Sequence, residues 1–520
     1  MDRRLVRALA LGIATGLFGS AAAPADAASP VKPPTSAQEA ERMQRIEDHM
    51  RALQEELATM KQGREVDAAK VEEVESELHT LQDLFARVKV GGYGSVRYEA
   101  NDLQNEKSTF TFRRMVLTTE AQINEHMRFY TEIEYERFRQ LELERTVTPT
   151  DGGLQVEQAF EGTNGSEISV EQAWLEYAID PRLRLRAGGV LVPIGRFNLD
   201  HDDNQWDLTR RTLVDRGTPV IPIKAAWDEL GVGFNGDFQV GEGNLGYQLY
   251  VVNGATIDVE LEEIAQTRNP DTNKLELEAK FSPQTGTFSN DVKNAKAVAG
   301  RLAWTPETGQ ELAFSFYTGR YTPDYLANQR VSSFALDGLT SFLGFELEGE
   351  LVTTRWSGIR SVAKSFAERS FNQKGAIEDT TPGANLETEV EFELANLAKQ
   401  KTGYWLELRY PFWPEFLPTF GFAHPQLIPV GRFEQVWFDD LLTEAGFSNG
   451  VLDEFDTRDA RLSRGTVGLA YRPTPLVVFS AAYEYTWAHR GSLVGLTNFL
   501  NATPSEGHAN AFTMGVAFGF

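Results

Sequence analysis

The spacing of hydrophobic positions changes once along the chain, near residue 89. Between Met43 and Val88, apolar residues recur every seven positions in two series that are three residues apart. This is the spacing of the a and d positions of a coiled coil, and it predicts an α-helical coiled coil over residues 43–88. From residue 89 onward, apolar residues alternate with polar ones, which is typical of strands with one apolar face.

One heptad of the helical pattern is polar. Arg64 occupies an a position and Asp67 a d position, next to Gly63. Polar core residues cost stability and fix the register or the oligomeric state of a coiled coil. Because a coiled coil needs a partner helix, the segment predicts an oligomer. The alternative is a single helix that packs on its own domain.

The last ten residues, AFTMGVAFGF, show the alternation most clearly. One face carries only large apolar side chains, and the other carries small or polar residues. The apolar side chains are those of Phe512, Met514, Val516, Phe518 and Phe520. We expect this strand to close a barrel with its apolar face toward lipid, since a terminal aromatic residue resembles the sorting signal of outer-membrane barrels.

The connections between the alternating segments differ in length in a regular way. Short connections contain turn residues, as at 180–181 and 241–243, whereas long polar ones span 139–166, 193–226, 254–294, 321–341, 360–400, 439–460 and 490–509. This arrangement predicts an all-β transmembrane barrel of about 16 antiparallel strands over residues 89–520. A strand pair near 343–356 has no clear turn. A large soluble β-sandwich is the alternative, but aromatic residues at strand ends favour a lipid interface.

The start of the chain has the features of an exported protein. Residues 1–27 combine three arginines, a short apolar run and the sequence Ala25-Asp26-Ala27, so they predict a cleaved signal peptide. A membrane-anchoring helix is the alternative, although the apolar run is short for a bilayer span. Residues 28–42 are rich in proline and alanine and predict a linker.

Composition excludes several classes of function. The 520 residues include no cysteine, which excludes thiolate metal sites and cysteine catalysis, and the net charge of −25 argues against nucleic acid as a partner. No histidine shares an inward strand face with a serine and an acid, so we expect no catalytic residues, no enzyme activity and no cofactor. The acidic run from Asp200 to Asp203 offers oxygen ligands, but it lacks the glycine of a calcium loop, so we expect no metal site.

Charged residues on the polar faces of the strands predict the lining of a pore. If the apolar faces meet lipid, these charges face an aqueous lumen. The predicted pore-wall residues are Arg114, Arg128, Glu132, Glu134, Arg182, Arg184 and Arg186. The last three arginines share one strand face and predict a path for anions. The alternative is that they pair with Glu176 and neighbouring acids across strands.

The long connection 193–226 is the predicted constriction loop, since it contains apolar turns that can pack inward. Its basic residues, which are candidates for the constriction, are Arg196, Arg210, Arg211, Arg216 and Lys224. Five aspartates in the same segment balance these charges. Charge count alone therefore predicts no anion selectivity for this loop.

Several stretches resemble one family of porins. They are FTFRRMVLTTEAQINEHMRFYTEIEY, WLEYAIDPRLRLRAGGVLVPIGRF, WDLTRRTLVDR and GYWLELRYPF. They are similar to the phosphate-selective porin O and P family, whose members often carry an N-terminal helical segment. The resemblance implies a homotrimer of 16-stranded barrels in the outer membrane, with passive uptake of anions guided by arginines. The negative charge of this chain departs from that pattern.

Together these features predict a porin in the outer membrane of a Gram-negative bacterium, with its coiled coil in the periplasm. It would pass small ions and solutes, with anions such as phosphate implied by the resemblance. Its partners would be outer-membrane lipid, other copies of the chain, small inorganic ions and, through the coiled coil, peptidoglycan. The alternatives are a general or cation-preferring porin, and a plugged barrel that acts as a surface binding protein.

Overall fold

The computed structural model describes residues 36–62, 87–103, 108–136, 141–150, 153–162, 167–217, 220–224, 226–263, 275–285, 291–365, 387–393, 398–448, 451–489 and 507–520. The chain divides into two units, Met1–Phe85 and Ala86–Phe520. The predicted signal peptide (1–27) lies outside the described residues. So does much of the predicted coiled coil, from residue 63 to residue 86.

The described part of the first unit is one helix, α2 (Ser36–Gln62). It begins inside the segment predicted as a linker, where Ser36 is followed by Glu39 in the S-x-x-E pattern of a helix start and no proline follows. The seam residues Met50, Leu53 and Leu57 are only partly exposed, whereas the residues between them are exposed. A coiled coil is not shown. No helix among the described residues combines the length and apolarity needed to cross a bilayer.

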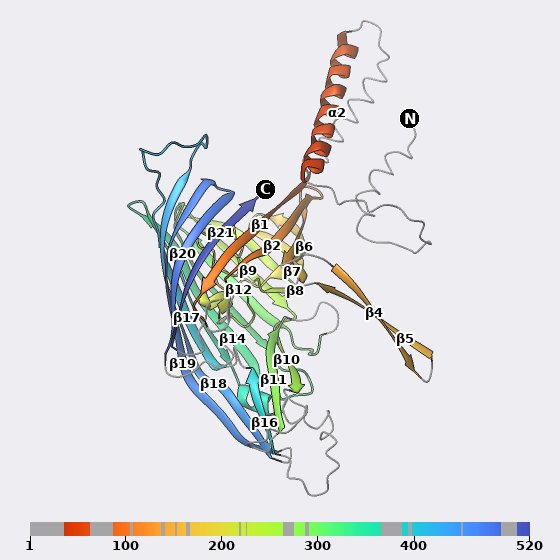
Figure 1. The fold of residues 1–520 in the computed structure, drawn as a ribbon. Helices are drawn as coiled ribbons and strands as arrows, with labels where there is room; N and C mark the ends of the chain where they lie inside the picture. The colour runs from red at the N-terminus through yellow and green to blue at the C-terminus, as the bar shows by residue number, and fades with distance from the viewer. Residues whose placement is uncertain are drawn as a thin grey trace. The chain divides into compact units, whose positions relative to one another are not determined.

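The second unit is a closed antiparallel β-barrel of 16 strands, which confirms the predicted fold (Figure 1). Each strand pairs with the next one in the ring, and β21 pairs with β1 to close it. In ring order the strands are β1 (Val88–Asn101), β2 (Thr109–Gln122), β3 (Met127–Glu136), β6 (Glu167–Asp180), β7 (Leu183–Leu191), β8 (Asp228–Val240), β9 (Gly243–Val252), β12 (Ala297–Thr305), β13 (Glu311–Arg320), β14 (Arg330–Phe342), β15 (Phe345–Trp356), β17 (Ala398–Arg409), β18 (Gln426–Ser448), β19 (Val451–Thr474), β20 (Val477–His489) and β21 (His508–Gly519).

In the described parts of the long connections lie five further strands. The hairpin of β4 (Leu141–Thr150) and β5 (Gly153–Gly162) is a separate two-stranded sheet. The hairpin of β10 (Thr256–Glu263) and β11 (Leu275–Gln284) joins the barrel sheet through β16 (Glu387–Glu393), which pairs with β18. Several connections predicted as polar loops therefore contain regular pairing.

Two segments predicted as long loops belong to barrel strands. Residues 330–342 form β14, and a two-residue turn at Leu343-Gly344 joins it to β15. Both turn residues have positive φ (50° and 81°), as in a type I′ hairpin turn. A leucine at the first position hides this turn from the sequence, because Asn or Gly is the usual signal. Residues 439–448 and 451–460 likewise belong to β18 and β19.

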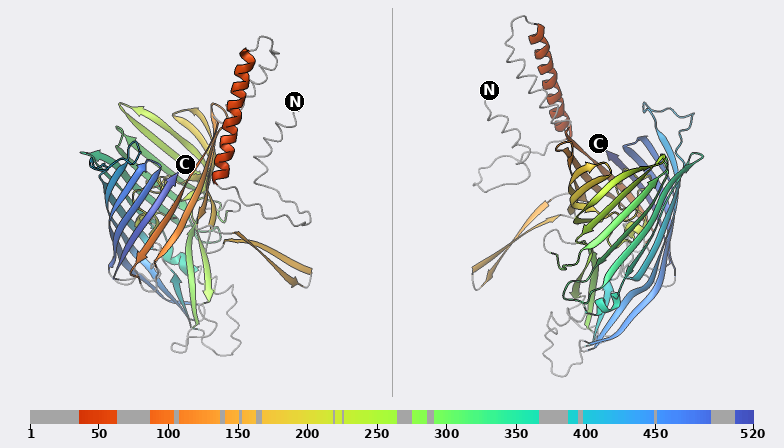
Figure 2. Two further views of the ribbon diagram at one scale, coloured as in Figure 1. Left: turned by 45° about the horizontal axis from the view of Figure 1, so that its top comes forward. Right: turned by 180° about the vertical axis from the view of Figure 1, so that it is seen from behind.

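Figure 2 shows the ring of strands in two further views. The alternation along these strands gives the barrel an apolar outer face, as predicted. In β21, the side chains of Phe512, Met514 and Phe518 are exposed, whereas Thr513 between them is buried. In β7, the leucines are exposed and the arginines between them are half-buried. The inner face is less uniformly polar than predicted, since Val436, Phe438 and Leu462 lie buried in an apolar core.

Candidate pore and its inner loop

The connection between β7 and β8 supplies much of the buried apolar core. Val192, Ile194, Leu213 and Val214 are almost completely buried within one cluster that includes side chains of β15, β17 and β18. The local sequence explains the burial, because apolar residues are spread along the whole segment rather than gathered at its ends. We call residues 192–227 the inner loop.

Aromatic rings fix the inner loop to β17. Phe197 stacks on Trp206 with 4.2 Å between ring centroids, and Trp206 meets Trp405 edge-on at 5.7 Å. Trp405 in turn donates a hydrogen bond to Glu350 of β15 (3.3 Å). Aromatic pairs in such geometries contribute about 0.5–1.5 kcal/mol beyond their buried area. The contacts among these three rings therefore stabilise the position of the inner loop against β17.

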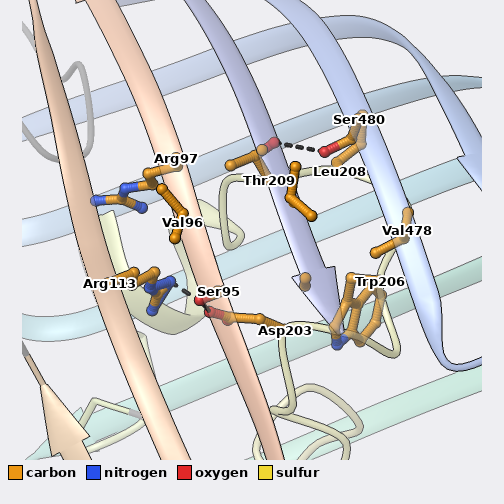
Figure 3. Close-up of a pocket in the computed structure, with 13 residues that line it drawn as sticks. Ser95, Val96, Arg97, Arg113, Asp203, Trp206, Leu208, Thr209, Val478 and Ser480 are labelled. Carbon is orange, nitrogen blue, oxygen red and sulfur yellow. Dashed lines mark hydrogen bonds and ion pairs between the residues drawn. The ribbon is translucent and has the colours of Figure 1, made fainter. Parts of the chain in front are cut away.

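Asp203 of the inner loop lies among arginines and a serine (Figure 3). Ser95 donates a hydrogen bond to its Oδ2 (2.6 Å), and Arg113 donates to its Oδ1 (3.3 Å). Arg114 and Arg211 lie 3.7 and 3.9 Å from its carboxylate oxygens. Burial alone would raise the pKa of Asp203, but the neighbouring guanidinium groups hold it well below its usual range. A cavity of about 20 Å³, large enough for one water molecule, adjoins Ser95 and Arg113.

Arg210 connects the inner loop to both sides of the barrel seam. Its guanidinium lies 2.9 Å from Glu99 of β1 and 2.5 Å from Glu484 of β20, and all three side chains are about 1% exposed. The preceding residue, Thr209, is hydrogen-bonded to Ser480 of β20 (2.7 Å). The ion pairs therefore cross the junction of the first and last strands of the barrel.

Arg196 and the backbone beside it bind the opposite wall. Arg196 pairs with Glu348 of β15 and with Glu311 of β13 (2.9 Å to the latter). The backbone N–H groups of Arg196 and Phe197 both donate to Glu350 (3.2 Å each). Further along the loop, the N–H of Leu213 donates to Glu434 of β18 (2.5 Å). Wall carboxylates thus hold the loop at several points around the ring.

A histidine–glutamate cluster holds the inner loop to β3 and β6. His201 Nε2 lies 3.2 Å from Glu171, and His201, Glu171 and Glu132 each have a ligand-type atom within 4.8 Å of the others. Burial disfavours a charge on His201, but the hydrogen bond to Glu171 and the charges of both glutamates outweigh it and raise the pKa of His201 to about 9. At neutral pH the protonated imidazole is an ion-pair partner of these carboxylates and offers no lone pair to a metal.

Arg184 and Arg186 lie on β7, whereas Arg182 lies in the exposed turn before it and not on the predicted strand face. Each of the three has an acidic partner nearby. Arg182 binds Asp180 through two hydrogen bonds, Arg184 lies 2.6 Å from Asp237, and Arg186 lies 2.6 Å from Glu176. The sequence analysis gave pairing with acidic residues as the alternative to a path for anions, and this pairing is present. Of these three arginines, Arg186 is the one that pairs with Glu176. The guanidinium of Arg186 also lies over the ring of Trp174, 3.9 Å from its centroid.

The other predicted wall residues are buried or half-buried in ionic contacts. Arg114 is fully buried and lies 2.9 Å from Glu134, and Arg128 is half-buried and lies 3.0 Å from Glu176. Glu132 accepts a hydrogen bond from Gln172 (2.7 Å). They lie on the inner face, as the alternation predicts.

The remaining loop candidates divide between buried and exposed positions. Arg211 is buried near Asp215 (3.8 Å) and Asp203, beside Arg210 in the sequence. Lys224 is exposed. The side chain of Arg216 lies outside the described residues. The roles of these residues at a constriction stay predictions.

Glu171 is the clearest residue that sequence reasoning missed. Strict alternation along β6 hides its orientation, because the pairing of β3 with β6 shifts between Glu132 and Ile133. The shift changes which residues of β6 face inward and buries Glu171 beside His201. A bulge of this kind has no signal in the residue types around it.

Comparison with known proteins identifies relatives of the barrel. Residues 89–335 match the model of the family "Phosphate-selective porin O and P", which confirms the resemblance over that segment. An uncharacterized protein of Aquifex aeolicus (strain VF5) is 29% identical over 169 residues, which make up 32% of this chain and 32% of that protein. The match thus spans about a third of that relative.

Solved structures that match this chain include two named porins. An anion-selective porin from Comamonas acidovorans is 10% identical with a TM-score of 0.45, and the match covers 83% of this chain and 99% of that one. OmpF of Salmonella typhi, in complex with daunomycin, is 12% identical with a TM-score of 0.45 over 83% of this chain and 97% of that one. The family match and the closed barrel indicate an outer-membrane channel.

Proposed function

We propose, from the match of residues 89–335 to the phosphate-selective porin O and P family, that this protein is a passive outer-membrane channel for small anions, with inorganic phosphate as a permeating solute. The family match carries this proposal. It is supported by the group of Arg113, Arg114 and Arg211 around Asp203 and Ser95, since guanidinium and hydroxyl groups also bind oxyanions well.

The inner loop would supply the constriction of this channel. Selectivity in such pores comes from charged groups at the narrowest point, where the low-dielectric wall focuses their field. We assign the constriction to Arg196, Arg210, Arg211, Arg216 and Lys224. The wall residues, led by Arg182, Arg184 and Arg186, would guide anions toward it. Lys224 and Arg182 are the exposed members of the two groups, so a mobile anion meets them without displacing a buried ion pair.

A general or cation-preferring porin is the second candidate. Six of the predicted arginines have a carboxylate within 4.0 Å, so little of their charge is left for a solute. They are Arg182, Arg184, Arg186, Arg196, Arg210 and Arg211. The chain as a whole carries a net charge of −25. The apolar core that the inner loop helps to form also keeps open the idea of a plugged barrel that binds partners at the surface.

The decisive experiment is the reversal potential of the purified full-length protein in a planar bilayer under a KCl gradient, followed by addition of millimolar phosphate. Chloride selectivity with block of the current by phosphate would support the anion channel. Potassium selectivity without block would favour the general porin. Absence of channels in a protein that migrates as a folded barrel would favour the plugged barrel.

Two matched variants localise the effect. Lys224→Gln removes an exposed loop charge, and Lys296→Gln removes an exposed charge outside the inner loop that is paired with Asp291 (2.7 Å). If the inner loop sets selectivity, the first variant shifts the reversal potential toward potassium and the second leaves it unchanged. Equal shifts would contradict the assignment.

We also propose that residues 1–27 are a signal peptide and that residues 43–88 form a periplasmic coiled coil that joins three chains. The unbroken heptad spacing supports the coiled coil. Sedimentation of the full chain and of a chain without residues 43–88 tests the proposal, because loss of the trimer in the shortened chain is expected. Cosedimentation of the full chain with purified peptidoglycan tests the weaker idea that this segment contacts the cell wall.

A further inference from the structure

The outer face of β13, β14 and β15 changes character toward the ends that lead into the long connections. Phe314, Phe334, Leu336 and Leu351 are exposed by 45–48%. Further along the same strands comes a row of hydroxyl groups, in which Thr318 is hydrogen-bonded to Ser332 (2.9 Å). Arginines follow this row. An apolar band followed by polar residues marks the boundary between acyl chains and headgroups.

Two arginines at this boundary lack acidic partners. Among the residues that the structure describes, neither Arg330 nor Arg355 has a carboxylate within ion-pair distance. The guanidinium of Arg330 donates a long hydrogen bond to Thr318 (3.4 Å). By contrast, each of four described arginines elsewhere pairs with a carboxylate: Arg182, Arg184, Arg186 and Arg210. In a chain with an excess of acidic residues, two neighbouring unpaired arginines indicate an anionic partner from outside.

The two arginines share one concavity. Its volume is about 380 Å³, and it is lined by Asn328, Arg330, Ser332, Arg355 and Ser357. Ser332 lies directly opposite Arg355 in the pairing of β14 with β15, and Arg330 is two residues away on the same face. Diagonal neighbours of this kind lie about 7–8 Å apart at Cα, so both guanidinium groups can reach one phosphate.

We propose that this concavity binds a phosphate group of a glycolipid in the outer leaflet of the outer membrane. The long connections of a bacterial barrel face the cell exterior, which puts the two arginines at the outer leaflet. Acyl chains of the same lipid would lie along Phe314, Phe334 and Leu336. The guanidinium groups of the two arginines would donate hydrogen bonds to the phosphate oxygens. A freely diffusing phosphate would gain nothing from the apolar band. This inference concerns the outside of the barrel and does not depend on what the channel conducts.

The test compares binding of two lipids to the full-length protein in detergent. The probes are bisphosphorylated lipid A and the same lipid after enzymatic dephosphorylation, and bound lipid is counted by native mass spectrometry. We expect the phosphorylated lipid to bind about 10- to 30-fold more tightly, because each arginine near a phosphate contributes about one kcal/mol. The double variant R330Q/R355Q is expected to lose that preference.

Matched variants separate specific binding from loss of charge. Lys399→Gln removes an exposed charge of β17 that already pairs with Asp440 (3.1 Å), and it should bind lipid as the native chain does. Ser332→Glu adds a negative charge inside the concavity and should weaken binding as much as the double variant. It provides a second test if the double variant does not fold.

Two results would overturn the proposal. One is equal binding of both lipids to the native protein, which would mean that acyl chains alone attach. The other is unchanged lipid binding in R330Q/R355Q and in Ser332→Glu together with a change in oligomeric state, which would identify the face as a contact between copies of this chain.

Discussion

The arginines of the β6–β7 hairpin (Arg182, Arg184 and Arg186) and those of the inner loop pair with acids at different separations along the sequence. Arg184 and Arg186 pair with acids on adjacent strands, and Arg182 pairs with an acid two residues away. Arg196 and Arg210 instead pair with acids more than 100 residues away in the sequence. The first group stabilises neighbouring strands, whereas the second holds a connection against the wall. Loss of an inner-loop arginine should therefore lower the free energy of unfolding much more than loss of an arginine of the β6–β7 hairpin.

The largest effect is expected for Arg210→Ala. This change removes the cation that the buried Glu99 and Glu484 share and leaves Glu99 with Arg97 (3.2 Å). Breaking a buried pair typically costs about 3–5 kcal/mol. The measurement is the free energy of unfolding in urea, with the protein in lipid bilayers. A variant as stable as the native chain would show that loop and wall arginines do not differ.

The next largest effect is a pH dependence that originates at His201. Its pKa of about 9 lies above the ordinary value of 6.5, so its stabilising contribution is complete below pH 6.5 and is lost as the pH rises through 9. The loss should reach about 3 kcal/mol at most. Unfolding free energies at pH 6.5, 8 and 10 are compared with those of His201→Gln. The difference between the two proteins should shrink as the pH rises, and a constant difference would contradict the assignment.

A smaller effect is expected for Arg186→Gln. The variant loses the ion pair to Glu176 and the contact with the Trp174 ring, but Arg128 still neutralises Glu176. We expect a loss of about 1–2 kcal/mol in the free energy of unfolding. A loss as large as that of Arg210→Ala would remove the distinction between the two groups of arginines.

The smallest effect is expected for Arg182→Gln. Arg182 is exposed and its contact with Asp180 is open to water, so screening leaves little net attraction. The unfolding free energy should not change measurably. The reversal potential under a KCl gradient is the sensitive measurement here, and a shift toward potassium would show that this exposed charge acts on permeating ions.

The contrast also explains what the sequence could predict. Alternation places Arg184 and Arg186 on one face of a strand and Leu183 and Leu185 on the other, and the structure agrees. The pairing of neighbours follows from that geometry. The partners of Arg196 and Arg210 could not be predicted, because a long connection has no period that relates its residues to distant strands.

Two other failures have equally local causes. Leu343 occupies a turn position with positive φ, which breaks the residue preferences on which turn prediction depends. Glu171 lies beside a shift in strand register that reverses the expected face. The identity of the solute could not be predicted from the sequence either, because it depends on which charges remain unneutralised inside the folded barrel.

The position of Arg210 has a consequence for how the protein is assembled. Glu99 belongs to the first strand that is synthesised and Glu484 to the last but one, so both contacts exist only when the two ends of the sheet have met. Before that point the sheet is open, and Arg210 of the inner loop has neither of these two carboxylates as a partner. The ion pairs of Arg210 therefore couple closure of the barrel to docking of the inner loop, so that the two steps become one cooperative event.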